Sequence, residues 1–352
     1  MIETTLDIGR LTLENGESLD AVKQQATIYG DPVTADEIVL VTHALSGNSR
    51  AADWWAPLIG PGRLFDPLHE CVICINALGS CYGSSGPGDV RSFPAITVGD
   101  MVNAQARALH LLGINYIDTV IGGSLGGMQA LQWCLAYPRR VGTGIVIGAY
   151  DSFSAQGIAL NALGREAIRN DPRDGVSLAR KIAMLSYKSD ELLEQRHANR
   201  RDRNGSSKYD VEAYLDYQGA QFAHRMNAQS YVCLTNAMDA FDVRDYPIKR
   251  TDPRLIFVGI SSDGLFRSER VHEASLRMKA RGFDARYAEL ASPDGHDAFL
   301  SNGAQLSAIL SGERGFARRR HAGYLGRCGV MIAPSISGVP FMRSRCGNRN
   351  PP

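Results

Sequence analysis

Residues 122–127, with the sequence GGSLGG, have the spacing of a serine nucleophile held in a tight turn. They follow the apolar run 119–121 and precede the apolar segment 128–133, so Ser124 lies between an expected strand and an expected helix. The G-x-S-x-G pattern carries meaning in this strand–turn–helix context. Glycines leave room for the strand and helix to pack around a strained serine backbone. The pattern predicts that Ser124 is a catalytic nucleophile, and an ordinary glycine turn is the alternative.

A serine nucleophile needs a general base, and the base needs an acid that orients it. Behind an elbow of this kind the acid precedes the histidine in the chain. The expected strand 255–260 runs into Asp263, and the next expected strand, 285–290, runs into a loop that contains His296. Each of the two alone could be an ordinary turn or loop residue. Their joint position behind the elbow predicts a catalytic triad of Ser124, Asp263 and His296.

Acyl transfer through a serine also needs two N–H groups that stabilise an oxyanion. One should be the amide of Leu125, which follows the nucleophile at the start of a helix. The other should come from the loop after an early strand, and the strand 38–42 runs into the sequence HALSG. The amide of Leu45 is therefore the second candidate, and we interpret His43 in the same loop as structural.

These residues need a scaffold that brings distant loops together, and the sequence provides one. Short apolar runs rich in β-formers alternate with helical segments such as 100–112 and 269–279, after an N-terminal hairpin over residues 11–29. Strands that alternate with helices predict a mostly parallel α/β sheet covered by helices on both faces. The expected strands are 38–42, 71–75, 119–121, 143–147, 255–258 and 285–290.

Residues 152–250 differ from this pattern, because they are almost free of strand signals and rich in helix formers and charges. They predict a helical lid inserted into a core made of residues 1–151 and 251–314. Residues 315–352 are rich in arginine and contain no acid. We expect a weakly ordered basic tail there. A nucleic-acid-binding arm is the alternative, although no interleaved aromatic residues support it.

The composition limits the class of protein. A chain of 352 residues with 44% hydrophobic residues can bury a large core, and a net charge of +1 gives no general attraction to nucleic acid or membranes. The start of the chain has no apolar leader, and no apolar run is long enough to span a bilayer. We expect a cytoplasmic protein with no membrane partner. Cys71 and Cys74 form a C-x-x-C, which we interpret as buried strand thiols, with a metal or redox site as the alternative.

Six segments occur in one order along residues 8–310 and carry a family resemblance. The chain resembles the homoserine O-acetyltransferase family, acyltransferases with the α/β-hydrolase fold. The resemblance implies acyl transfer from acetyl-CoA to the hydroxyl of L-homoserine on the route to methionine, without a metal or cofactor, by a cytoplasmic homodimer that assembles through its lids. The segments are 42–48 (THALSGN), 59–62 (IGPG), 76–87 (NALGSCYGSSGP), 93–97 (FPAIT), 122–129 (GGSLGGMQ) and 295–300 (GHDAFL).

The resemblance also implies roles for three further residues. Arg180 and Tyr187 match an Arg/Tyr pair that faces the substrate, and a guanidinium can bind an amino-acid carboxylate through two hydrogen bonds. They lie about two helical turns apart, so both can share one helix face. Asp297 matches an acid that holds the substrate ammonium. An exposed helix face for Arg180 and Tyr187, and a solvated loop acid for Asp297, are the alternatives. The resemblance also covers the residues selected above: the family's triad matches Ser124, Asp263 and His296, and its oxyanion amides match Leu45 and Leu125.

The sequence alone is compatible with several hypotheses about the function. A related transferase would use succinyl-CoA or acylate serine, and the sequence identifies no extra cation for a succinyl group. A simple esterase would give Arg180 and Asp297 no substrate role, and a non-catalytic interaction protein would not need the triad. The loop 86–93 is shorter than the corresponding family segment, which leaves the shape of the active-site mouth open.

Overall fold

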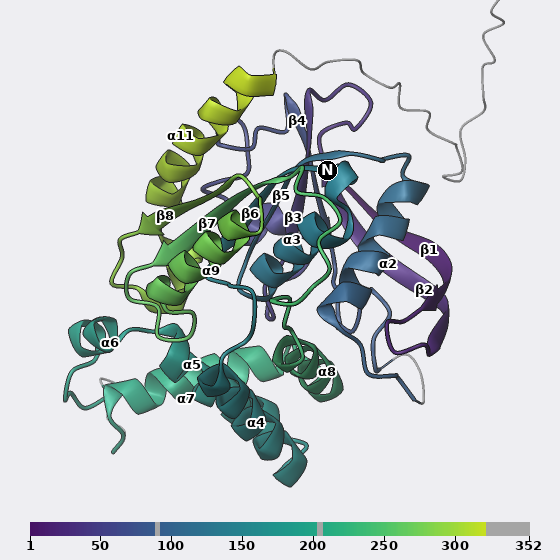
Figure 1. The fold of residues 1–352 in the computed structure, drawn as a ribbon. Helices are drawn as coiled ribbons and strands as arrows, with labels where there is room; N and C mark the ends of the chain where they lie inside the picture. The colour runs from purple at the N-terminus through teal and green to yellow at the C-terminus, as the bar shows by residue number, and fades with distance from the viewer. Residues whose placement is uncertain (89–91, 203–206, 322–352) are drawn as a thin grey trace, which may run out of the picture.

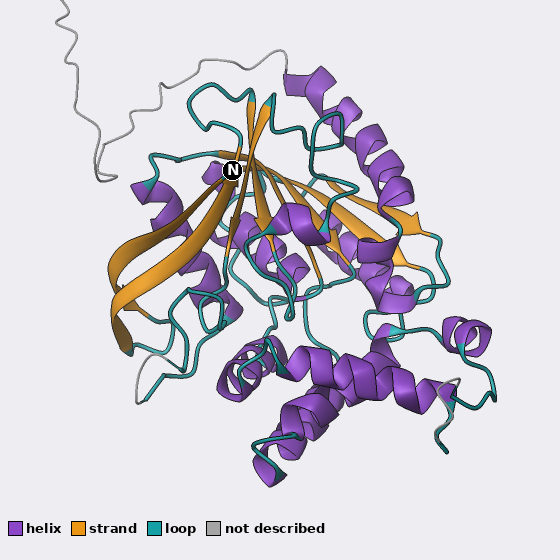
Figure 2. Cartoon of the chain, turned by 180° about the vertical axis from the view of Figure 1, so that it is seen from behind, coloured by secondary structure: helices purple, strands orange, loops and turns teal. Residues whose placement is uncertain are grey.

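The computed structural model describes residues 1–88, 92–202 and 207–321, and an eight-stranded sheet forms its centre (Figures 1 and 2). The strand order is β1-β2-β4-β3-β5-β6-β7-β8, and all neighbours from β4 to β8 in this order are parallel. The predicted α/β-hydrolase fold is confirmed. The strands are β1 (Ile2–Thr12), β2 (Ser18–Tyr29), β3 (Glu37–Thr42), β4 (Glu70–Ile75), β5 (Ile117–Gly123), β6 (Val141–Ile147), β7 (Arg254–Ile260) and β8 (Ala285–Leu290).

The hairpin of β1 and β2 is antiparallel, as predicted, but β1 begins at Ile2, well before the expected strand. β1 lies at the edge of the sheet, and most of its side chains are exposed. An edge strand of this kind has few apolar residues to mark it in the sequence. The central strand β4, in contrast, is buried at every residue and was predicted within one residue of its bounds.

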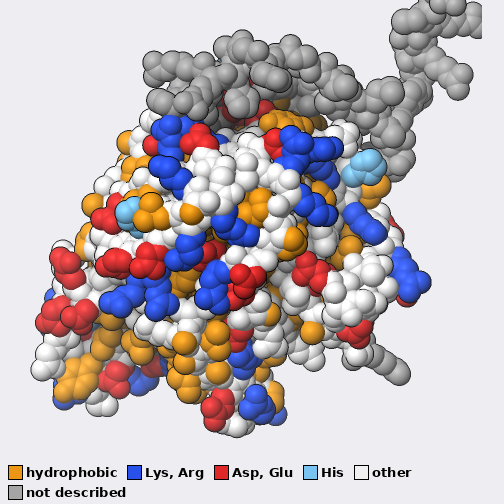
Figure 3. All heavy atoms as spheres, viewed as in Figure 1, with side chains coloured by type: hydrophobic (Ala, Val, Ile, Leu, Met, Phe, Trp, Pro, Cys, Tyr) orange, Lys and Arg blue, Asp and Glu red, His pale blue; other side chains and the backbone are white. Residues whose placement is uncertain are grey.

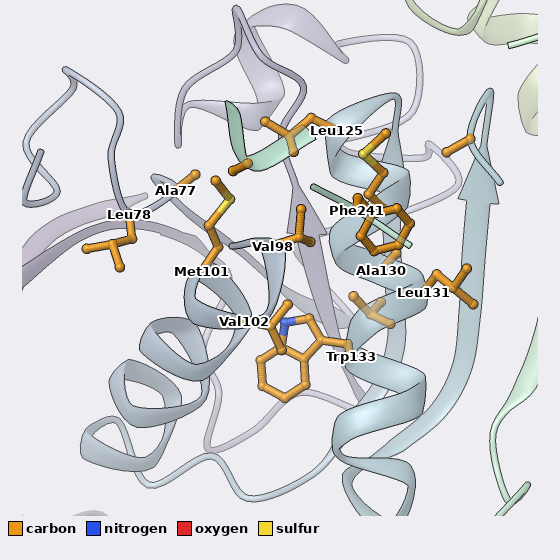
Figure 4. Close-up of a cluster of buried hydrophobic side chains, with 14 of the residues drawn as sticks. Ala77, Leu78, Val98, Met101, Val102, Leu125, Ala130, Leu131, Trp133 and Phe241 are labelled. Atoms are coloured by element: carbon orange, nitrogen blue, oxygen red, sulfur yellow. The ribbon is translucent and has the colours of Figure 1, made fainter. Parts of the chain in front are cut away.

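Helices cover both faces of the sheet. One face carries α2 (Val98–Leu111), α3 (Leu125–Ala136) and α9 (Ser268–Ala280), and the other carries α1 (Ala51–Trp54), α10 (Ala298–Ser301) and α11 (Gly303–His321). Two short 3-10 helices, η1 (Pro138–Arg140) and η2 (Gly295–Asp297), join these elements. Figure 4 shows part of the larger apolar cluster, where side chains of α2 such as Val102 and of α3 such as Trp133 fill the space between the helices. This packing fixes α3, and with it the turn that carries Ser124.

The region between β6 and β7 is helical, and we call residues 152–250 the lid. In Figure 1 its helices form a layer below the sheet, next to the loops that follow β6 and β7. The described part of the lid contains α4 (Ala155–Asn170), α5 (Gly175–Tyr187), α6 (Asp190–Arg196), α7 (Asp210–Ala223) and α8 (Ala228–Asp239).

Two regions that the sequence analysis singled out lie partly outside the described residues. α11 continues to His321, so the first residues of the proposed basic tail are helical, whereas residues 322–352 are not described. In the loop 86–93, residues 89–91 are not described either. Within the described ranges no helix is long and apolar enough to cross a membrane.

The C-x-x-C of β4 does not form a joint site. Cys71 packs in the apolar cluster on one face of the sheet, and Cys74 packs in the cluster on the opposite face. Both thiols are fully buried, and burial raises the pKa of Cys71 to about 12. This placement agrees with the interpretation as buried strand thiols. No group of metal-ligating side chains occurs among the residues that the structure describes.

Candidate active site

Ser124 occupies the strained turn between β5 and α3 that the sequence pattern predicts. Its φ of 59° and ψ of −128° lie in a region that non-glycine residues rarely adopt. A Cβ on Gly126 would lie 2.1 Å from the carbonyl oxygen of Thr42, and one on Gly122 would lie 2.3 Å from the Oγ1 of the same threonine. The glycines are therefore required because the end of β3 packs directly against the turn.

His296 and Asp263 form a buried hydrogen-bonded pair. The Nδ1 of His296 lies 2.6 Å from the Oδ2 of Asp263. The other carboxylate oxygen of Asp263 accepts hydrogen bonds from the amides of Leu265 and Phe266, each at 2.8 Å. Because the carboxylate accepts, Nδ1 carries the proton and Nε2 is free to act as a base. Nε2 is buried and has no hydrogen-bond partner among the described residues.

The end of β6 brings this pair next to the nucleophile turn. The amide of Ser124 donates to the carbonyl of Ile147 at 2.9 Å. The next residue, Gly148, abuts the pair, because a Cβ there would lie 3.3 Å from the His296 ring and 3.4 Å from the Asp263 carboxylate. The backbone of Ser124 and the His296–Asp263 pair therefore both lie at the end of β6.

Three aromatic rings surround His296. Phe266 stacks on it at 5.2 Å between ring centroids, and Tyr187 and Phe299 each lie at 5.6 Å. Burial lowers the pKa of His296, but the charge and hydrogen bond of Asp263 together raise it more, so that the pKa ends above the ordinary value of 6.5.

The predicted oxyanion amides lie in two segments that hydrogen bonds hold together. Leu125 provides the first amide of α3, and the first amides of a helix have no partner within it. Leu45 lies in the turn after β3, which the amide of Gly47 closes by donating to the carbonyl of Ala44 at 2.9 Å. The hydroxyl of Thr42 donates to the carbonyl of Gly126 at 2.8 Å and joins the two segments.

A buried chain of amide side chains also supports the Leu45 loop, and the sequence analysis missed it. Gln129 of α3 donates to the carbonyl of His43 at 3.2 Å and accepts from Gln105 of α2 at 2.7 Å. Gln105 in turn accepts from the indole of Trp133 at 2.8 Å. Polar side chains on the buried faces of two helices are the only sequence signal of this chain of bonds.

His43 holds the same loop from the other side. Its Nε2 accepts from the amide of Ala77 at 2.9 Å, and its Nδ1 donates to the carbonyl of Ala44 at 2.8 Å. Burial lowers the pKa of His43 to about 4, so the ring is neutral at pH 7. These bonds agree with the structural interpretation of His43.

Tyr187 of α5 lies next to the ring of His296, and Arg180 of the same helix lies over the Tyr187 ring. The Arg180 guanidinium lies 5.2 Å from the centroid of the Tyr187 ring and 5.0 Å from that of Phe222, a residue of α7 that the sequence did not indicate. The Nε of Arg180 is buried without a hydrogen-bond partner, and no acid pairs with its guanidinium in the described part of the chain. Arg180 therefore places an unmatched positive charge beside Tyr187, whose ring lies next to the candidate base.

Asp297 is not a solvated loop acid. It lies in η2 directly after His296, and its Oδ2 lies 2.9 Å from the Nζ of Lys188. The Lys188 and Asp297 side chains are 13% and 20% exposed. The sequence analysis did not indicate Lys188, which gives no signal apart from its position after Tyr187.

Comparisons with known proteins agree with this architecture. A family model described as alpha/beta hydrolase fold matches residues 37–302. A homoserine O-acetyltransferase of Symbiobacterium thermophilum is 40% identical over 82% of this chain and 88% of its own length. One of Moorella thermoacetica is 37% identical over 85% of this chain and 92% of its own length. A crystal structure of a homoserine O-acetyltransferase from Staphylococcus aureus aligns with a TM-score of 0.76 at 26% identity, over 93% of this chain and 96% of that one. The chain belongs to the homoserine O-acetyltransferase family of α/β-hydrolase-fold enzymes.

Proposed function

We propose that this protein transfers the acetyl group of acetyl-CoA to the side-chain hydroxyl of L-homoserine through an acetyl-enzyme on Ser124. The observation that carries the proposal is the position of Tyr187, whose ring lies 5.6 Å from the ring of the candidate base His296 and 5.2 Å from the guanidinium of Arg180. A base and a cation that share one aromatic neighbour suit an acceptor that has both a hydroxyl and a carboxylate. The activity of the relatives supports the same reaction, and we take the product to be an intermediate on the route to methionine.

In the first half-reaction, the Nε2 of His296 takes the proton of the Ser124 hydroxyl while Oγ attacks the thioester carbonyl. The amides of Leu45 and Leu125 stabilise the oxyanion, and such donors typically contribute about 3 to 4 kcal/mol each in the transition state. When the oxyanion collapses, the carbon–sulfur bond breaks, and the departing CoA thiolate takes the proton from His296 and leaves as the thiol. The acetyl group remains on Ser124.

In the second half-reaction, L-homoserine binds with its carboxylate on Arg180 and its ammonium on Asp297. His296 takes the proton of the homoserine hydroxyl, whose oxygen attacks the acetyl ester. The ester bond to Ser124 then breaks, and the serine oxygen takes the proton back from His296. The reaction needs no metal or redox cofactor, because the two substrates supply the acyl group and its acceptor.

Thiol release from acetyl-CoA tests the proposal directly. With purified protein we expect release that depends on L-homoserine and is lost in Ser124→Ala. Release that requires Ser124 but does not change when L-homoserine is added would indicate a hydrolase or another acceptor. Release only with succinyl-CoA or only with L-serine would indicate a related transferase. No release with any of these substrates would contradict an enzymatic function for the site.

Removing the charge of Arg180 should weaken acceptor binding selectively. Arg180→Met should raise the KM for L-homoserine about 30- to 150-fold, as expected when hydrogen bonds to a charged group worth about 2 to 3 kcal/mol are lost. Hydrolysis of 4-nitrophenyl acetate should change little, because that reaction needs only the triad and the oxyanion amides. Arg169→Met, at an exposed position of α4, is the matched control. A parallel loss of both activities would contradict an acceptor-binding role.

We also propose that two copies of the chain associate through their lids. Large apolar side chains of three lid helices are exposed, and Figure 3 shows hydrophobic groups along the lower edge of the molecule, where these helices lie. A surface of this kind typically marks a protein interface. Light scattering should give the mass of a dimer, and a monomeric mass at micromolar concentration would contradict the proposal. The exposed side chains are Ile158, Leu163, Leu178, Leu185 and Tyr217.

A further inference from the structure

The ion pair between Lys188 and Asp297 connects the lid to the loop of the candidate base. Lys188 is the residue directly after α5, and Asp297 follows His296 in the chain. The charged atoms are 2.9 Å apart, and both side chains are largely buried. The mechanism above uses Asp297 for the acceptor ammonium, yet in this structure the ammonium of Lys188 already occupies that carboxylate.

Other contacts already hold the two segments together. A Cβ on Gly295, whose φ is +72°, would lie 2.5 Å from the carbonyl oxygen of Tyr187 and 2.7 Å from the amide nitrogen of Ser189. The hydroxyl of Ser189 donates to the carbonyl of Pro293. The backbone on both sides of Lys188 is therefore fixed by close packing and a hydrogen bond that do not involve its ammonium. If Lys188 only held the lid to the loop of His296, its side chain would not need a charge.

Within the described part of the chain, each acid around the Lys188–Asp297 ion pair has a partner, but the cation of Arg180 does not. Asp263 pairs with His296, and Asp297 pairs with Lys188, whereas Arg180 has no acid partner among the described residues. An amino-acid acceptor brings a carboxylate, which matches Arg180, and an ammonium, which must compete for Asp297. Other titratable groups around the pair include the phenols of Tyr187 on α5 and Tyr214 on α7, and both sense the charges of Arg180 and Asp297. Tyr231 of α8 also senses Arg180, and Arg196 of α6 acts on Tyr214.

We propose that Lys188 stands in for the acceptor ammonium: it neutralises Asp297 while the acceptor site is empty, and the α-ammonium of the acceptor displaces it. This inference rests on the function proposed above and adds a residue that determines acceptor selectivity. An ammonium and a lysine side chain interact with a carboxylate in the same way, so one can replace the other without leaving the buried acid unpaired. The apparent affinity for the acceptor is reduced by the need to displace Lys188.

The ion pair between Lys188 and Asp297 also affects His296 before the acceptor binds. In the first half-reaction His296 must be neutral to take the serine proton. The charge of Asp297 raises the pKa of His296, and the charge of Lys188 lowers it. With Lys188 in place, the base stays available at lower pH while the site contains no acceptor. We call Lys188 a positioning residue, because it acts through Asp297 and not on the reacting atoms.

The test compares Lys188→Met with Lys188→Arg in the full-length protein. Lys188→Met should lower the KM for L-homoserine about fivefold to tenfold, because the competing cation is gone. It should not lower the KM for 4-hydroxybutanoate, which lacks the α-ammonium. Without acceptor each enzyme molecule releases one equivalent of thiol as Ser124 is acetylated, and the acid limb of the rate of this single burst should move to higher pH. Lys188→Arg should restore both properties. The matched control is Lys181→Met, which removes a lysine of α5 that pairs with Asp216 at 2.5 Å.

A higher KM for L-homoserine in Lys188→Met would overturn the proposal, since Lys188 would then assist acceptor binding. Equal changes for both acceptors, or an unchanged KM and pH profile, would overturn it as well. Lys188→Gln keeps a hydrogen bond to Asp297, and it serves as the second variant if Lys188→Met does not fold. The wild type is assayed in parallel. If its thiol release does not depend on L-homoserine, the proposed function fails, whereas a normal wild type with unchanged variants refutes only the role of Lys188.

Discussion

Replacing Ser124 by alanine should lower kcat/KM for acetyl-CoA and L-homoserine about 10⁵- to 10⁶-fold, the range expected for loss of a triad nucleophile. The alanine removes the atom that carries the acetyl group, so neither half-reaction can proceed. Thiol release with both substrates measures the effect. The backbone of the turn should persist, because the bonds that hold it come from the main-chain groups of residue 124.

A buried serine elsewhere provides the control for this variant. Ser275 lies in α9, and its hydroxyl donates only to the carbonyl of His272 within the same helix. Ser275→Ala should therefore keep wild-type kinetics. Residual activity of Ser124→Ala above about one hundredth of the wild type would point to direct transfer without an acyl-enzyme. Both variants should show similar thermal unfolding.

Replacing Asp263 by asparagine should lower kcat about 10⁴-fold. The two amides that donate to Asp263 can still donate to the asparagine oxygen, which turns the amide NH2 toward His296. The ring nitrogen that faces it must then accept, so the proton moves to Nε2 in most molecules and only a small fraction of His296 keeps the tautomer that acts as a base. Steady-state kinetics measures the effect. Asp242→Asn, which alters a surface ion pair with Arg244, is the matched control.

The pH dependence of this variant supplies a second readout. In the wild type the pKa of His296 lies above 6.5, so the activity should fall as the pH decreases through that higher value and the base becomes protonated. Without the charge of Asp263, burial alone lowers the pKa of His296. The acid limb of the residual activity should therefore move to lower pH. An unmoved acid limb would contradict the pairing of Asp263 with His296.

Much of the fold could be predicted from the sequence, because buried strands carry a strong signal. β4 agrees with the expected run to within one residue, since a strand covered on both faces needs nearly continuous apolar residues. β8 also has the expected bounds, although it contains Arg286 and Glu289 and only its two end residues are buried. β1 could be predicted only in part, because an exposed edge strand is selected for hydrogen bonding more than for burial. The capping box of Thr97 and Asp100 explains why α2 begins at Val98, two residues before the expected start.

The candidate triad residues could be selected from the sequence because each follows a strand at a defined place in the chain. The supporting residues could not be identified in this way. Gln129 contacts His43 across 86 positions, and Lys188 contacts Asp297 across more than one hundred. Nothing local marks either residue, since both depend on which helix face meets which loop. Phe222 reaches Arg180 only because α7 packs against α5.

The most direct test of the account is the mass of the intact protein after mixing with acetyl-CoA, before and after addition of L-homoserine. We predict a gain of one acetyl group, located on the peptide that contains Ser124, and its rapid loss on addition of L-homoserine with formation of the O-acetyl ester. Ser124→Ala should show no gain. An acetyl group that L-homoserine does not discharge faster than water, or none under conditions of measurable turnover, would contradict the central claim that Ser124 carries the acyl group to this acceptor.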